Sequence, residues 1–353
     1  MNGHFFIPKL YDIMTFKKEY KNMKLQLTLN SLALILCCGD LIPSSTQPIS
    51  TQEWQEIEKK LKSAHKEPSM ITGMSIDTLT QIIGLDEFTA HKIEKRQKLL
   101  PDLFYALQNL ENQDIGVTTI YEEDYPASLR VLGTKMPLVI SYIGDLSLSY
   151  GVNISVAGPQ MMNKTMRHVT KEIMKKISKE GYTVVVGGSK GVEELALRTQ
   201  LTNNGNAVLF VADHMFDKIR LYSKYIKQNK LVIMTANDPY ALFDVTHALD
   251  KNLYICGMVF AQIVTGTHIG SGPVWFTSIQ NIHSHWTRQL VYETLDYSGN
   301  IRLIEMGEAH FTDEDLKSEV TLAEILDNHE TVIKKDDPSI DQMTIFEFIE
   351  DKH

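Results

Sequence analysis

Cysteine is scarce in this sequence, and its few copies exclude a disulfide-stabilised protein. The chain has 353 residues and three cysteines, Cys37, Cys38 and Cys256, which are too few for a disulfide framework. None of them stands in a C-x-x-C pair, so a reducing, cytoplasmic location is expected. The twelve histidines are scattered, and the closest group, His283 and His285, lacks the spacing of metal ligands on a helix. We therefore expect no metal site and no cofactor.

The sequence also lacks an apolar run long enough to cross a membrane. Residues 25–38 follow four lysines and look like the apolar part of a signal peptide. However, Gln26, Thr28 and Asn30 interrupt the run, no small-residue cleavage site follows it, and it is too short for a bilayer. We expect a buried helix here and no membrane association.

An excess of positive charge, which is typical of nucleic-acid binding, is missing as well, because the formal net charge is −9. This acidity is local. Residues 311–353 contain thirteen Asp or Glu and four Lys or Arg, so the tail carries the whole net charge and residues 1–310 are formally neutral. The overall acidity therefore does not exclude a nucleic-acid site within residues 1–310.

Helical patterns fill the first third of the chain. Residues 1–24 are polar, aromatic and basic without a clear period, and we expect an N-terminal extension. Residues 25–112 carry apolar residues at helical spacing and predict a small helical domain, in which Thr51 is a candidate N-cap. Gly84 is predicted to end one helix and Asp86 to cap the next.

The segment around Gly84 is similar to a helix-hairpin-helix or SAM-like domain. A DNA-binding hairpin of this kind uses two glycines to bring backbone amides onto a phosphate, and only Gly84 is present. A purely structural helical pair is therefore favoured over a DNA-binding hairpin.

The clearest strand and helix signals lie between Asn153 and Leu201. An apolar run ends at Gly158 and is followed by a helical pattern, and a second run ends at Gly187 and opens a helix with an acidic first turn. Two such units in succession predict a parallel sheet. In parallel sheets, ligands bind beyond the carboxyl ends of the strands, where loop amides and helix N-termini face an anion.

Further apolar runs extend this pattern on both sides. They predict an α/β fold with about six parallel strands and an additional pair before them. The expected strands, besides the two above, lie at residues 116–120, 137–143, 207–212, 231–234, 260–264 and 289–292.

A set of short motifs follows one order along residues 113–310. The motifs are Tyr125-Pro126-x-x-Leu129, Pro137 with Gly144-Asp145, Gly158, Gly187-Gly188-x-x-Gly191, Asp250-Lys251-Asn252, Gly270-x-Gly272, Gly299-Asn300 and Leu303-Ile304-x-x-Gly307. This ordered set resembles the DNA-processing protein A family, also called DprA or Smf. The resemblance implies an extended Rossmann-like sheet with helices on both faces, preceded by a helical domain.

The resemblance also implies a function. Family members bind single-stranded DNA without cutting it, form homodimers through the Rossmann-like domain, and hand the strand to a RecA-type recombinase during natural transformation. The residues expected to contact nucleic acid stand in the glycine-rich loops and beside Lys251. They are Gly158, Gln160, Gly187, Gly188, Ser189, Lys190, Gly191, Lys251, Asn252, Gly270, Ser271 and Gly272.

Several residues depart from the family pattern. The first loop reads Gly158-Pro159-Gln160 where the family has Gly-Ser-Arg, so a cation is missing. Lys190 and Lys251 stand where the family carries arginine, and lysine keeps the charge but loses the bidentate fork that fits phosphate. Glu193 replaces aspartate and Leu197 replaces histidine. Weaker or altered anion binding is expected.

Other interpretations of the same loops remain open. The glycines could only permit tight turns, and Trp275 could be a stacking face for a base, although a core position is favoured. A nucleotide-sensing module, for example in phage defence, or a nucleotide-processing enzyme could share the fold. No nucleophile and base stand at a recognisable spacing, so an enzyme is not expected.

The acidic tail, residues 311–353, is too short for the winged helix that ends some family members. Gln342, Ile345 and Phe346 belong to a segment similar to the peptide with which bacterial proteins dock on the sliding clamp. A strand or short helix that closes the fold is the alternative.

Overall fold

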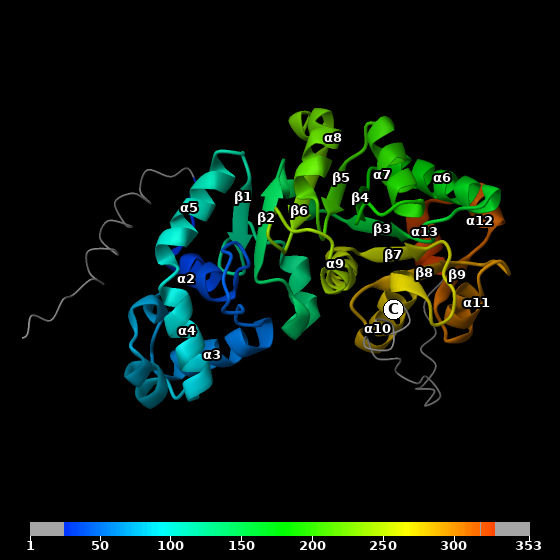
Figure 1. The fold of residues 1–353 in the computed structure, drawn as a ribbon. Coiled ribbons are helices and arrows are strands. Elements are labelled where there is room, and N and C mark those ends of the chain that lie inside the picture. Colours follow the sequence, from blue (N-terminus) through cyan, green and yellow to red (C-terminus); the bar gives the residue numbers. More distant parts are fainter. Residues whose placement is uncertain (1–24, 318, 329–353) are drawn as a thin grey trace, which may run out of the picture. The chain divides into compact units, whose positions relative to one another are not determined.

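The computed structural model describes residues 25–317 and 319–328 (Figure 1). The expected N-terminal extension and the clamp-docking residues Gln342, Ile345 and Phe346 lie outside the described residues. The chain divides into two compact units. Of the described residues, 25–125, 134–143 and 236–239 form a helical unit, and 126–133, 144–235, 240–317 and 319–328 form a sheet unit.

The helical unit contains the expected N-terminal helices and an antiparallel strand pair, in which Val117 stands opposite Ser141. Its elements are α2 (Leu29–Cys38), α3 (Thr51–Ser63), η1 (Pro68–Gly73), η2 (Thr78–Ile82), α4 (Glu87–Gln97), α5 (Leu100–Glu111), β1 (Gly116–Thr119) and β2 (Val139–Ile143).

The signal-like run forms α2, which is buried from Ser31 to Cys37, as expected for a core helix. Among the described residues, no helix combines the length and the apolar character needed to cross a membrane.

Helix caps in this unit follow local side-chain chemistry. Asp86 caps α4 as predicted, since its side chain accepts a hydrogen bond from Thr89 N at 2.9 Å. The prediction for α3 was wrong by one residue. Ser50 is the N-cap and forms a capping box with Glu53, whereas the Thr51 hydroxyl donates to Met136 O at 3.0 Å. Ser50 and Glu53 each accept a hydrogen bond from the other's backbone amide. Thr51 could not form such a pair, because the residue three positions after it is Trp54, whose side chain has no acceptor.

The sheet unit contains seven parallel strands among its described residues, in the order β6-β5-β4-β3-β7-β8-β9. The strands are β3 (Asn153–Ala157), β4 (Thr183–Val186), β5 (Ala207–Phe210), β6 (Leu231–Thr235), β7 (Ala261–Val264), β8 (Arg288–Tyr292) and β9 (Ala309–Phe311). The mostly parallel α/β fold with a preceding helical region is thereby confirmed. The last strand, β9, lies beyond the strands that the sequence pattern indicated.

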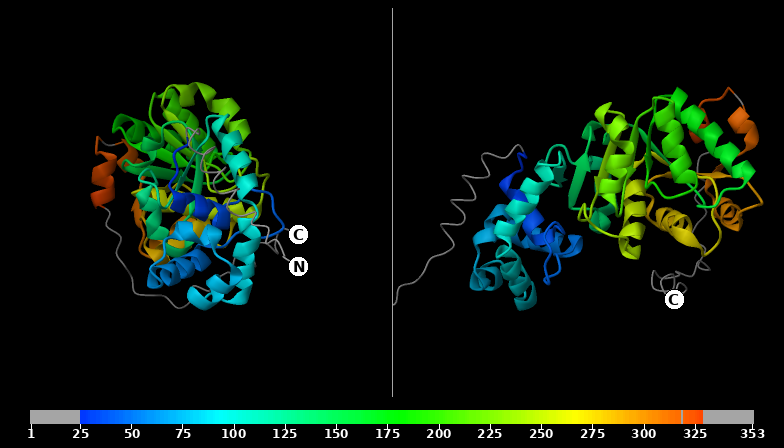
Figure 2. Two further views of the ribbon diagram at one scale, coloured as in Figure 1. Left: turned by 90° about the vertical axis from the view of Figure 1, so that its left-hand side faces the viewer. Right: turned by 45° about the horizontal axis from the view of Figure 1, so that its top comes forward.

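Helices cover both faces of this sheet (Figures 1 and 2). One face carries α6 (Lys164–Lys179), α7 (Val192–Thr202) and α8 (Met215–Lys227), and the other carries α9 (Val245–Met258), α10 (Gly272–Ser284) and α11 (Ser298–Glu305). The apolar spacing in α6 buries Val169, Ile173 and Ile177, as the sequence predicts. Two further helices, α12 (Asp313–Lys317) and α13 (Leu322–Asn328), follow β9.

The chain changes direction within the sheet between β3 and β7. From β3 the strands proceed through β4 and β5 to β6, and α9 then brings the chain back to β7, on the other side of β3. The loops that follow β3 and β7 therefore leave the sheet toward opposite faces. Such a switch point opens a crevice beyond the carboxyl ends of the strands, where α/β proteins bind ligands.

Candidate nucleic-acid interface

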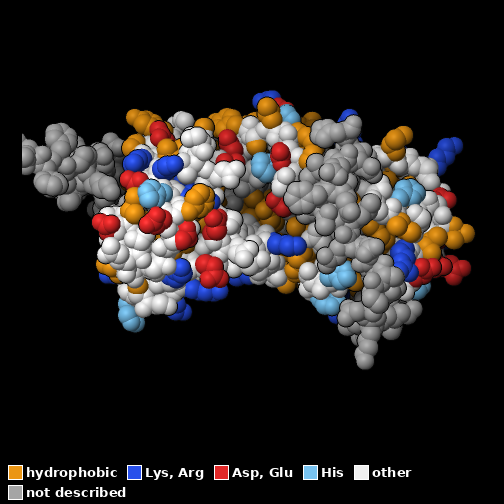
Figure 3. All heavy atoms as spheres, turned by 60° about the horizontal axis from the view of Figure 1, so that its bottom comes forward, with side chains coloured by type: hydrophobic (Ala, Val, Ile, Leu, Met, Phe, Trp, Pro, Cys, Tyr) orange, Lys and Arg blue, Asp and Glu red, His pale blue; other side chains and the backbone are white. Residues whose placement is uncertain are grey.

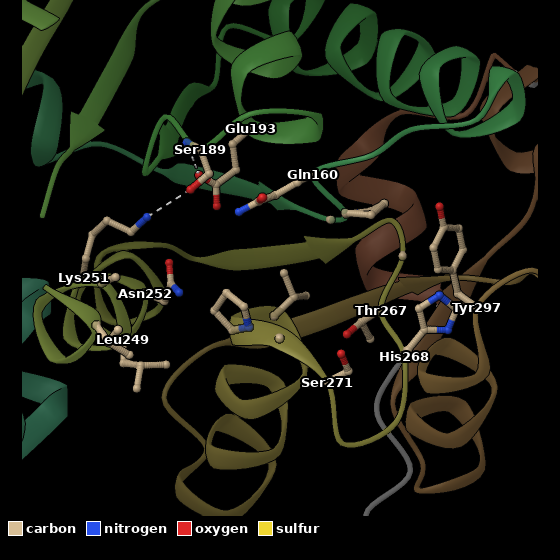
Figure 4. A pocket seen from close by; sticks show the side chains of 18 of the residues that line it. Gln160, Ser189, Glu193, Leu249, Lys251, Asn252, Thr267, His268, Ser271 and Tyr297 are labelled. Carbon is tan, nitrogen blue, oxygen red and sulfur yellow. Dashed lines mark hydrogen bonds between the residues drawn. The ribbon is translucent and has the colours of Figure 1, made fainter. Parts of the chain in front are cut away.

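A cavity of about 390 Å³ lies at this switch point. Figure 4 shows that its walls come from the loops after β3, β4 and β7, from α9 and from the N-terminus of α10. The lining residues are Gly158, Pro159, Gln160, Ser189, Glu193, Phe243, Val245, Ala248, Leu249, Lys251, Asn252, Gly266, Thr267, His268, Ser271, Gly272, Pro273, Val274 and Tyr297.

The structure brings together seven of the twelve residues expected to contact nucleic acid. Those that line the cavity are Gly158, Gln160, Ser189, Lys251, Asn252, Ser271 and Gly272. The other five, Gly187, Gly188, Lys190, Gly191 and Gly270, lie in the same loops but are not part of its lining.

Lys251 places a positive charge inside the cavity. Its side chain is 6% exposed, and its Nζ donates to Ser189 Oγ at 3.4 Å. An ideal Cβ on Gly187 would lie 2.2 Å from this Nζ, so a larger residue there would force the lysine side chain to shift. An ammonium group has three donors, and one long hydrogen bond leaves it able to bind an oxygen of a ligand.

Glu193 adds a negative charge beside Lys251. Its Oε2 accepts a hydrogen bond from Ser189 N at 2.9 Å. This amide was expected to face a phosphate, and the structure shows it engaged by the protein's own carboxylate. Acidic residues in a first helical turn also interact with the helix dipole, so the position of Glu193 in the sequence does not by itself indicate this bond.

The first two glycine loops pack directly against each other. Gly191 has a φ of 86°, and a Cβ there would lie 2.3 Å from Pro159 O. Val192 N donates to Pro159 O at 3.3 Å, and a Cβ on Gly158 would lie 2.2 Å from Thr265 Oγ1. These two glycines thus allow tight packing between loops, which is the turn-forming role considered from the sequence.

Two more lysines lie outside the cavity lining, near its second loop. Lys190 is exposed, and Lys218, on α8, donates from Nζ to Gly188 O at 3.3 Å. Sequence analysis named Lys190 but missed Lys218, because no motif marks a helix residue that reaches a loop thirty positions earlier. On the face drawn in Figure 3, acidic and basic side chains of the described residues are interspersed.

The loop after β7 is held by Asn300, a residue of α11. Asn300 Nδ2 donates to Tyr292 O at 2.7 Å and to Thr265 O at 3.2 Å, while its Oδ1 accepts from Thr267 N at 2.8 Å. The Asn300 side chain is fully buried. These bonds fix the loop backbone that forms one wall of the cavity.

The N-terminus of α10 forms the adjoining wall. Ser271 is its N-cap but makes no side-chain capping bond, and Pro273 stands in the first turn. The first-turn amides therefore lack a capping side chain beside the cavity, in a position that favours negatively charged groups.

Aromatic residues at the cavity were not those considered from the sequence. Trp275 is 9% exposed and packs in the core with Val264 and Leu303, so its role is structural. Phe243 lines the cavity and is 65% exposed, and Tyr297 lines it beside His268, with ring centroids 5.1 Å apart. Phe243, His268 and Tyr297 come from separate segments of the chain, and no regular spacing in the sequence identifies them as cavity residues. Within the described residues, no group of three or more His, Cys, Asp or Glu could hold a metal ion.

The fold is similar to solved structures of DNA processing protein A. The Streptococcus pneumoniae protein matches with a TM-score of 0.66 and 16% identity, over 87% of this chain and 99% of that chain. The Helicobacter pylori protein, whose single-stranded DNA binding mode has been described, matches with a TM-score of 0.50 and 15% identity, over 61% of this chain and 97% of that chain.

Sequence comparison gives two results. No curated protein matches this chain. The family model for DNA recombination-mediator protein A matches residues 116–315, more than half of the chain and all of the strands that surround the cavity. The chain therefore belongs to the DNA recombination-mediator protein A family.

Proposed function

We propose that this protein binds single-stranded DNA at the cavity and serves as a mediator of DNA recombination. The observation that carries the proposal is the set of lysines around one cavity of the family's domain. Lys251 lies inside it, and Lys190 and Lys218 lie by its second loop. The Helicobacter pylori protein, which shares the fold, has a described single-stranded DNA binding mode.

The groups around the cavity suit different parts of a single strand. Lys190 and Lys218, outside the lining, can take phosphates, with the salt dependence that follows from counterion release. Phe243 offers an exposed ring on which a base can stack, an interaction that tolerates any sequence. The uncapped amides of α10 add a second site for negative charge.

The remaining parts of the proposal concern partners and pathway. The bound strand would pass to a RecA-type recombinase in DNA uptake and recombination in the cytoplasm, as in natural transformation. Two copies would associate through the sheet unit, and Gln342, Ile345 and Phe346 would dock on a sliding clamp. The protein would act by binding alone, without catalysis.

A mobility-shift series with single-stranded and duplex DNA across salt concentrations tests this function. We expect single strands to bind more tightly. Lys190→Ala should weaken binding and reduce the slope of log affinity against log salt by up to about 0.7, the value for one phosphate of a single strand. Lys251→Met should also weaken binding, and it keeps most of the aliphatic stem that packs on Gly187.

Lys227→Ala is the matched control. Lys227 is exposed and lies in the last turn of α8, at the opposite end of this helix from the carboxyl ends of the strands. This variant should bind like the unaltered protein. Equal loss in all three variants, or no preference for single strands, would contradict the proposed function.

The volume of the cavity also favours a second candidate, a sensor of a small phosphorylated ligand. About 390 Å³ falls in the range of small-molecule sites. This function predicts a thermal shift with a mononucleotide and no oligonucleotide binding. A fold-related nucleotide-processing enzyme would instead show turnover in a hydrolysis screen.

A further inference from the structure

The loop after β4 binds a carboxylate of the protein itself. Glu193 lies in the first turn of α7, and its Oε2 accepts a hydrogen bond from Ser189 N at 2.9 Å. Lys251 is held on the same serine, since its Nζ donates to Ser189 Oγ at 3.4 Å. Ser189 is therefore the residue of the cavity at which a backbone amide and a cation come together, and a negatively charged group of the protein already occupies the amide.

A phosphate of a bound strand needs the same groups. Backbone amides of a loop that opens a helix bind anions, and a nearby ammonium group adds a charge-assisted hydrogen bond. A phosphate oxygen placed on Ser189 N would have to displace Glu193 Oε2, because the amide has one proton to donate. The two anions would also repel each other at this distance. Glu193 and the phosphate are thus alternative occupants of one position.

A second position for the Glu193 carboxylate lies at the neighbouring loop. Figure 4 shows the side chain of Gln160, from the loop after β3, directed toward Glu193. The two loops are packed together, since a Cβ on Gly191, two residues before Glu193, would lie 2.6 Å from Gln160 Cα. The Gln160 side chain makes no hydrogen bond within the described residues. Its Nε2 has two donors, so it can bind the carboxylate when this group leaves Ser189 N.

We propose that Glu193 is an internal competitor for the phosphate, held on Ser189 N in the free protein and moved to Gln160 when a strand binds. This inference rests on the proposed single-stranded DNA binding and adds a control on its affinity. Binding at Ser189 then exchanges one charge-assisted hydrogen bond for another and adds none. Gln160 is a positioning residue, because it stabilises the bound state through Glu193 and not through a contact with the strand.

The test measures the affinity of the full chain for a fluorescent oligothymidylate by anisotropy, near physiological salt. Glu193→Ala frees Ser189 N and should bind about tenfold more tightly, roughly the effect of one hydrogen bond to a charged group. Glu193→Gln keeps a carbonyl that accepts from Ser189 N but removes the repulsion, so its affinity should lie between those of Glu193→Ala and the unaltered protein.

Glu194→Ala is the matched control, since Glu194 is the next residue of the same helix and pairs with Arg198 at 2.6 Å. It removes the same charge, and salt screens that charge from the strand, so affinity should change by less than about twofold.

Gln160→Ala tests the second position of the carboxylate. Alone, it should weaken binding about threefold, because Glu193 loses the amide that receives it. Combined with Glu193→Ala, it should have no effect, since no carboxylate then needs a partner. Such a double-mutant cycle isolates the coupling between the two residues.

The outcomes separate this inference from the proposed function. Failure of the unaltered protein and of every variant to bind overturns both. Equal gains in Glu193→Ala and Glu194→Ala overturn the competition alone, because net charge would then explain them. So does a Glu193→Ala variant that keeps its melting temperature and binds no more tightly than the unaltered protein.

Two further results also decide the matter. If Glu193→Ala melts at a lower temperature, Glu193→Gln replaces it, and a Glu193→Gln variant that binds no more tightly than the unaltered protein overturns the competition. If Gln160→Ala weakens binding equally with and without Glu193→Ala, the move of Glu193 to Gln160 is overturned, because Gln160 would then contact the strand itself.

Discussion

At the scale of single residues, Arg96 is a buried cation that holds three parts of the helical unit. Its side chain is 1% exposed, and it donates from Nε to Leu36 O at 2.6 Å, from Nη2 to Gly39 O at 2.6 Å and from Nη1 to Thr46 O at 3.0 Å. The first of these carbonyls lies in the last turn of α2, where backbone acceptors have no helical partner. A guanidinium can reach all three because its donors form a planar fork.

Replacing Arg96 should therefore destabilise the protein strongly. Arg96→Met leaves two buried carbonyls and one partly buried carbonyl without a donor, and we expect a loss of about 3 kcal/mol or more in the free energy of unfolding. Arg96→Lys should recover only part of it, because lysine lacks the fork. Urea denaturation followed by circular dichroism measures the change. Lys98→Met, in an exposed pair with Glu94, is the control and should change stability by about 0.5 kcal/mol at most.

The residues of the cavity could be predicted only in part, for reasons visible in individual side chains. Ser189 stands in the glycine motif that follows β4, and Lys251 and Asn252 stand in a motif within α9, and the fold brings the three residues together. Phe243 and Tyr297 carry no motif, because their positions depend on loops that approach one another only after folding. The hydrogen bond from Ser189 N to Glu193 could not be predicted for another reason. An acidic residue at the start of a helix is already explained by its interaction with the helix dipole.

At the scale of secondary-structure elements, the prediction succeeded where one apolar pattern repeats. The central strands are short apolar runs, and β3 and β4 end directly before Gly158 and Gly187, where the sequence pattern ends them. The three-residue strand β9 gave no such signal. Its pairing with β8 depends on burial of Ala309 and Phe311 against neighbours distant in sequence. Short edge strands of this kind are set by tertiary packing.

The start of β9 buries an ionisable group, which makes stability depend on pH. Burial raises the pKa of Glu308 from 4.5 to about 7. Below its ordinary pKa, the Glu308 carboxyl group keeps its proton in both the folded and the unfolded chain, so its burial causes no pH-dependent loss of stability. As pH rises toward the folded pKa, the unfolded chain releases its proton first, so stability falls. The full penalty, about 3 kcal/mol, is present above the folded pKa.

Glu308→Gln should remove this dependence. At about pH 8 the variant should be more stable than the unaltered protein by up to about 3 kcal/mol, and at about pH 5 the difference should shrink below about 1 kcal/mol. Thermal unfolding at both pH values measures it. Glu305→Gln, at an exposed neighbour paired with Arg302, should show no such pH-dependent gain. A Glu308→Gln variant that is less stable at both pH values would contradict the prediction.

At the scale of the whole molecule, the described part of the acidic tail continues the sheet unit. Leu322 N donates to Glu180 Oε1 at 2.7 Å, and Leu316, Leu322 and Ile325 are buried. Composition alone could not show that the first part of the tail packs on the sheet unit, because residues 311–353 contain thirteen acidic residues and only a few leucines. Residues 329–353, which follow α13, hold seven acidic and three basic side chains, a net charge of −4.

This charge predicts a kinetic effect on DNA binding. A chain that ends at Asn328 should associate faster with single-stranded DNA at low salt, because less negative charge repels the incoming phosphates. Near physiological salt the Debye length falls to about 8 Å, so the difference between the two chains should diminish. Stopped-flow association rates across ionic strengths measure it. The control is a full-length chain in which residues 329–353 are scrambled, which keeps the charge of the tail. It should associate with DNA as slowly as the unaltered protein. Faster association would show that residue order in the tail, and not its charge, controls access to the cavity.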